Sequence, residues 1–120
     1  MPSAIVKNKL SASTDGRGIK VVATGTPGTT LHTAQSGTTS GSFDEIWVYA
    51  VNTDSVSRTL TVQFGGVTSP DDDLNITLTA GSGAVLIIPG FVLQNSTVVK
   101  AFADAANVIV IFGFVNTITA

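Results

Sequence analysis

The chain contains one histidine, His32, so any imidazole-based catalytic or metal site would have to be built around this residue. No Gly-x-Ser-x-Gly turn that would expose a nucleophilic serine accompanies it. We therefore predict that His32 is a partly exposed strand or loop residue with local hydrogen bonds. Because no acid, base, nucleophile and orienting group occur together, we predict that the protein is not an enzyme.

Carboxylates cluster at Asp71, Asp72 and Asp73, and such a cluster could bind a hard cation such as calcium. The glycine and the distal glutamate of an EF-hand loop are missing, so we favour a solvated turn whose charges protect a strand edge. Asp44 and Glu45 receive the same interpretation. The chain has no cysteine and lacks the Gly-Lys-Ser/Thr pattern of a phosphate-binding loop. We expect no metal and no cofactor.

Two aromatic residues, Trp47 and Tyr49, share one face of a predicted strand and could stack on a sugar ring. Trp47 lies in the middle of an apolar run, however, which favours a place in the core or at a subunit interface. Both interpretations stay open at this stage.

The basic residues are few and scattered. Lys7, Lys9, Arg17 and Lys20 form the one cluster that could neutralise phosphates, and it is too small to indicate a nucleic-acid partner. No apolar stretch has the length of a signal sequence or membrane span, so we expect no membrane association and synthesis in the cytoplasm.

The apolar residues recur with a period of two, which is typical of strands. Residues 58–64 and 74–79 alternate between apolar and polar positions, whereas 45–52 and 108–115 are apolar on both faces. Weaker strand patterns lie at 19–23, 29–33, 84–88 and 97–103. With short turns between them, these segments predict an all-β protein: an antiparallel, jelly-roll-like β-sandwich of about eight strands.

Residues 1–18 are polar, and we predict that they form an N-terminal arm attached to a single domain at 19–120. Residues 24–30 and 35–42 are expected to be exposed loops. Only 12% of all residues are charged and 43% are hydrophobic, which indicates a surface covered in an oligomer. The predicted partner-binding residues are Ile5, Val6, Lys7, Lys9, Arg17, Trp47 and Tyr49.

Several segments carry a family resemblance: FDEIWVYAVN at 43–52, LTVQFGG at 60–66, TSPD at 68–71, IPG at 88–90 and VKAFA at 99–103. Over residues 43–120 the chain resembles small β-rich virion proteins of tailed bacteriophages, most of all capsid decoration, or cement, proteins. The resemblance implies a homo-oligomer, with a trimer favoured, that binds the major capsid protein on the outer surface of the virion. The alternative is a tail or baseplate module that binds a host glycan through its loops and Trp47. The resemblance assigns no role to any individual residue.

Overall fold

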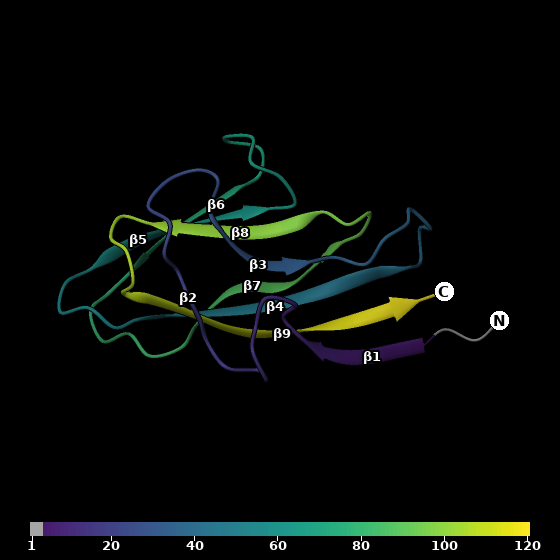
Figure 1. Cartoon of the computed structure of the whole chain (residues 1–120), viewed down its shortest axis with the longest axis horizontal. Helices are drawn as coiled ribbons and strands as arrows, with labels where there is room; N and C mark the ends of the chain where they lie inside the picture. The colour runs from purple at the N-terminus through teal and green to yellow at the C-terminus, as the bar shows by residue number, and fades with distance from the viewer. Residues whose placement is uncertain (1–3) are drawn as a thin grey trace.

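A computed structural model describes residues 4–120, which form nine strands in two antiparallel sheets (Figure 1). The sheets pack face to face, so the predicted all-β sandwich is confirmed. The described residues include no helix of the length and hydropathy that crossing a bilayer requires.

Sheet A has five strands and is ordered β1-β9-β4-β7, with the short β2 also paired to β9. Its long central strands, β4 and β9, pair over ten residues from Phe43↔Ile118 to Asn52↔Ile109. The strands of sheet A are β1 (Ala4–Lys9), β2 (Ile19–Lys20), β4 (Phe43–Asn52), β7 (Val85–Leu93) and β9 (Ile109–Thr119).

Sheet B has four strands in the order β3-β8-β5-β6. Its outer face is partly covered by the loop at 24–28. Residues 24–27 are themselves exposed, as predicted for 24–30, whereas Thr29 and Thr30 belong to β3. Gln63 on β5 is buried because its Oε1 accepts a hydrogen bond from Gly28 N (2.8 Å) and its Nε2 donates to Thr26 Oγ1 (2.8 Å). The strands of sheet B are β3 (Thr29–Thr33), β5 (Arg58–Phe64), β6 (Asp73–Leu78) and β8 (Val98–Ala103).

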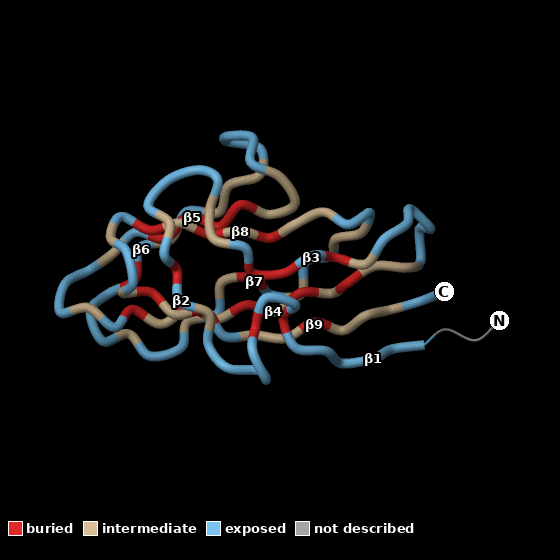
Figure 2. The backbone as a smooth tube through the Cα atoms, viewed as in Figure 1, coloured by how far each residue is buried: buried red, intermediate tan, exposed pale blue. Residues whose placement is uncertain are grey.

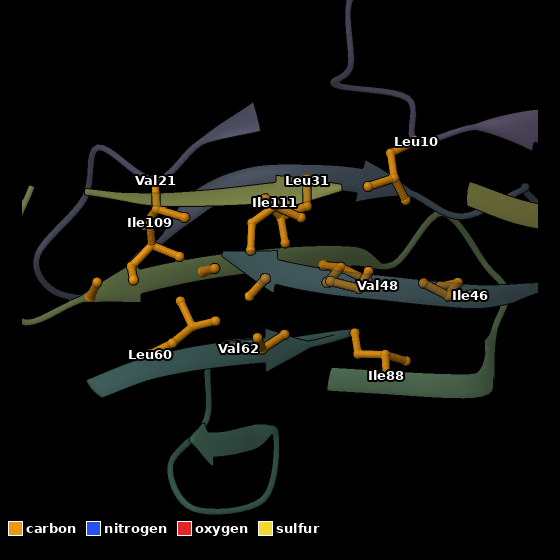
Figure 3. Packing of buried hydrophobic residues seen from close by; sticks show 14 of the residues in the cluster. Leu10, Val21, Leu31, Ile46, Val48, Leu60, Val62, Ile88, Ile109 and Ile111 are labelled. Atoms are coloured by element: carbon orange, nitrogen blue, oxygen red, sulfur yellow. The ribbon is translucent and has the colours of Figure 1, made fainter. Parts of the chain in front are cut away.

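The core lies between the sheets, where one face of each central strand is buried (Figure 2). In β4 every second residue from Asp44 to Asn52 is buried, which is the two-residue period of a strand against a core. Each fully buried Val, Leu or Ile side chain contributes about 1.5–3 kcal/mol through removal from water. Figure 3 shows how the two sheets interlock through Ile46, Val48, Leu60, Val62, Ile88, Ile109 and Ile111.

The N-terminal segment differs from the predicted arm, of which residues 1–3 lie outside the described residues. β1 pairs with β9 from Ala4↔Thr119 to Lys9↔Phe114 and forms the edge of sheet A, with all six side chains exposed. Leu10 is fully buried in the core. Residues 4–18 are therefore part of the sandwich, because an edge strand needs backbone pairing and not an apolar sequence.

Candidate functional site

The outer face of sheet A carries a broad apolar surface. The buried residues of β4 point toward sheet B, so the alternate residues from Phe43 to Val51 point away from it. Pairing places the alternate residues of β9, from Val110 to Ile118, beside them. We call this surface the apolar face; its apolar side chains are Phe43, Trp47, Tyr49, Val51, Val110, Phe112, Phe114 and Ile118, with Leu86, Pro89 and Val92 from β7.

This face is open within the described chain. Phe112 is 41% exposed and Leu86 is 44% exposed. β1 extends the sheet sideways and does not cross over its outer surface (Figure 1). The two-sided apolar pattern at 45–52 and 108–115 thus corresponds to one face in the core and one face at the surface.

Trp47 lies at the centre of the apolar face. Its ring stacks on Phe114, with ring centroids 6.1 Å apart and an interplanar angle of 13°. Gly90, with φ at +84°, approaches so closely that a Cβ there would lie 2.9 Å from Cζ2 of Trp47. The ring is half-buried on the outer side of the sheet. The expected place in the core is therefore wrong for Trp47, whereas the subunit-interface alternative stays a prediction.

Glu45 is the acidic group of this face. Its Oε1 accepts hydrogen bonds from Trp47 Nε1 (2.9 Å) and from Asn116 Nδ2 (3.0 Å). These two bonds, the one from Trp47 first, stabilise the carboxylate and lower the pKa of Glu45 below its ordinary value, while desolvation opposes them. Glu45 thereby fixes the orientation of the indole.

We expect the fluorescence of Trp47, the only tryptophan, to report the titration of Glu45. The stabilisation from a lowered carboxyl pKa is present above the pKa of the unfolded chain and is lost as pH falls through the pKa of the folded chain. The emission should therefore change at a pH below the usual range of glutamate, and Glu45→Gln should abolish this change. Asp54→Asn, which removes a carboxylate paired with Arg58, serves as the control. A midpoint at or above the ordinary glutamate value would contradict the assignment.

Basic side chains border the apolar face. Lys7, Lys9 and Lys20 pair in register with Asn116, Phe114 and Val110, so all three point to the same side as the aromatic rings. Lys7 Nζ lies 4.2 Å from the centroid of the Phe114 ring, a cation–π contact. The border is thus positive although the chain carries a net charge of −2.

Arg17 lies at the end of this border, in a turn that leads into β2. It lines a cavity together with Ile19, Val110 and Phe112. Within residues 4–120, Arg17 takes part in none of the ion pairs.

His32 and Asp44 are both buried, which corrects the predictions of a partly exposed histidine and of a solvated turn at Asp44. His32 is 4% exposed, and its Nε2 lies 2.6 Å from Oδ2 of the buried Asp44. Its Nδ1 accepts a hydrogen bond from Ser11 N (3.0 Å), so the proton sits on Nε2 and is donated to Asp44. Gln35 Nε2 completes the network by donating to Asp44 Oδ1 (3.3 Å) and to Ile118 O (3.0 Å). Both ring nitrogens are occupied, so this pair joins β3, β4 and the N-terminal segment.

The three aspartates at 71–73 lie where the connection between β5 and β6 ends. Asp72 accepts a hydrogen bond from Thr68 N through Oδ2 (3.0 Å), while Asp71 is exposed. In the part of the chain that the structure describes, no group of three or more potential metal ligands comes together. Asp71 and Asp72 thus lie in a turn, as expected, whereas Asp73 begins β6 and its Oδ1 is buried without a hydrogen-bond partner among the described residues, so the interpretation of a solvated turn is wrong for Asp73.

No known relative was found. A scan against models of protein families gives no match, and neither curated proteins nor solved structures give one. The resemblance to phage decoration proteins accordingly stays a hypothesis, and the function has to be argued from the surface itself.

The structure brings most of the predicted partner-binding residues to one surface. Ile5 pairs with Ile118 and so joins the apolar face, whereas Val6 points to the opposite side of the sheet. Sequence analysis missed Phe112 and Phe114, because an uninterrupted apolar run does not show which of its residues point outward. It also missed the pair of His32 and Asp44, for which no local pattern exists.

Proposed function

We propose that this protein is a capsid decoration protein of a tailed bacteriophage, which binds the outside of the shell through the apolar face. The open apolar face is the observation that carries the proposal. Soluble monomers rarely leave so broad an apolar surface in contact with water, and such surfaces mark sites of protein–protein contact. Aromatic residues at the centre with polar residues at the border are typical of interfaces.

The charges favour an acidic partner surface. The border of the apolar face carries Lys7, Lys9 and Lys20, while the carboxylate of Glu45 is already engaged by Trp47 and Asn116. A protein shell that presents acidic side chains around an apolar patch would complement this arrangement. The major capsid protein is the partner that this proposal assigns.

Self-association belongs to the same proposal, with a trimer favoured. Several copies held in one assembly would bind a repetitive shell by multivalent contacts, each of modest strength. No chemistry is needed for such a role, because the shell is stabilised by linking neighbouring subunits. Ile5 belongs to the apolar face and is 69% exposed at the edge of the sheet, so it is available for contacts between copies.

We expect the purified protein to co-sediment with undecorated heads of its parent phage, and Leu86→Glu to reduce that binding by about tenfold or more. A charge placed in the apolar face would be buried without a partner on binding, which costs at least about 1.4 kcal/mol. Leu86 is 44% exposed in the free protein, so the fold should tolerate the change. The measurement is co-sedimentation at increasing protein concentration, with light scattering to give the number of copies.

Val67→Glu provides the matched control. Val67 is 48% exposed and lies in the connection between β5 and β6, away from the apolar face. This variant introduces the same charge at a similar exposure and should bind heads like the unchanged protein. Equal binding by both variants would show that the apolar face is not the contact surface, and an absence of binding by the unchanged protein would refute the proposed function.

A further inference from the structure

A cavity of about 320 Å³ opens where the turn before β2 meets the outer side of β9. Val110 and Phe112 form the wall from β9, and Arg17 and Thr14 are the residues of the turn segment with polar side chains in the lining. The volume is at the lower end of the range found for small-molecule sites. The lining residues are Ala12, Thr14, Arg17, Gly18, Ile19, Val110 and Phe112.

The turn that carries Arg17 is held in place by hydrogen bonds of its own. Ser13 is buried, and its Oγ donates to Arg17 O (2.7 Å). Arg17 N donates to Thr14 O (2.9 Å). Gly18 packs so closely on β9 that a Cβ there would lie 2.9 Å from Cε1 of Phe112. The cavity is therefore formed in advance of any ligand, which reduces the ordering that binding requires.

The chemistry of the lining combines one cation with an aromatic wall. Arg17 forms no ion pair within residues 4–120, and no carboxylate is among the lining residues; Asp15 belongs to the same turn but does not line the cavity. The Phe112 ring is 41% exposed. Lys20, opposite Val110 on the neighbouring strand, adds positive charge beside the cavity.

We propose that this cavity binds a carboxylate-bearing sugar ring, of the hexuronic acid class. A planar guanidinium matches a carboxylate through two parallel hydrogen bonds. The apolar C–H face of a sugar ring fits against an exposed phenyl ring, and the Thr14 hydroxyl can donate to or accept from a sugar hydroxyl. An anion without a ring would use Arg17 alone and leave the aromatic wall without a contact.

This site differs from the sugar platform that the sequence suggested at Trp47 and Tyr49. The Trp47 ring is half-buried and stacks on Phe114, and its Nε1–H is donated to Glu45, so its polar group is already engaged. The cavity lies at the opposite end of β9 from Ile118. The cavity shares Val110 and Phe112 with the apolar face, but the inference needs no contact with a capsid.

The test is a titration of the whole chain, labelled with ¹⁵N, with three separate probes: sodium glucuronate, glucose and inorganic phosphate. We expect saturable amide shifts at residues 12–19 and 110–112 with glucuronate, in the millimolar range, and none with glucose. Phosphate should bind more weakly than glucuronate because it lacks the ring. Saturation with phosphate at equal strength would refute the sugar part, and an absence of shifts with glucuronate would refute the site.

Two variants make the test specific. Arg17→Ala should weaken glucuronate binding by about tenfold, as expected for the loss of a charge-assisted contact. Lys100→Ala removes one positive charge from sheet B and should leave the affinity unchanged. Equal effects of both variants would show a non-specific charge effect and contradict the proposal. Since no phage head takes part, the outcome is independent of the result of the co-sedimentation experiment.

Discussion

His32→Ala is expected to lower the free energy of unfolding by about 3 kcal/mol, because it leaves the buried side chain of Asp44 without its closest hydrogen-bond donor. The substitution takes away the Nε2–H donor that lies 2.6 Å from Asp44 Oδ2. Asp44 is 2% exposed, so water cannot replace that donor. Of the side chains in this network, Gln35 alone would still donate a hydrogen bond to Asp44, and that bond is long at 3.3 Å. Ser11 N also loses its acceptor.

Urea denaturation followed by circular dichroism measures this loss. The double variant His32→Ala/Asp44→Ala should be more stable than the sum of the two single changes predicts, because it removes both members of the pair. We further expect faster amide exchange in β1 in the single variant, since Ser11 anchors the end of that strand to His32. A cost below about 1 kcal/mol for His32→Ala would show that the pair does not hold the segment.

The fold could be predicted because several of its strands show an alternation of apolar and polar residues in the sequence. In residues 58–64 and 74–79 the apolar positions alternate with polar ones, and β5 and β6 cover these segments closely. The edge strand β1 was missed because its six exposed side chains carry no apolar pattern, and backbone hydrogen bonds to β9 alone define it. An alternation of apolar and polar residues cannot identify a strand whose side chains are exposed on both faces.

The apolar face could be predicted in part. The apolar character of 45–52 and 108–115 on both sides indicates that one side is free for a partner, and the structure places one side of each segment at the surface. The sequence left Trp47 either in the core or at a subunit interface, and the structure places its half-buried ring on the outer side of the sheet. The Arg17 cavity depends on contacts between a turn and a strand more than ninety residues apart along the chain, which no local motif encodes.

Gly113→Val is expected to cost about 3 kcal/mol, the upper end of the usual cost of overpacking. Gly113 lies opposite Val48 in the central pair of sheet A. A Cβ at this position would meet the carbonyl oxygen of Trp47 directly and would lie 3.2 Å from Cα of Val48. A branched side chain therefore has to push β4 and β9 apart in the middle of their hydrogen-bonded ladder.

The matched control is Gly25→Val, because a Cβ at Gly25 meets nothing within 4 Å and its φ lies outside the left-handed region. That change should alter the free energy of unfolding by no more than about 0.5 kcal/mol. Thermal denaturation of both variants gives the comparison. Since Gly113 directly precedes Phe114, whose ring stacks on Trp47, separation of the strands should also shift the Trp47 emission in the folded variant. If Gly113→Val were as stable as Gly25→Val, β4 and β9 could not be packed as closely as the geometry requires, and the apolar face that they carry would lose its rigid support.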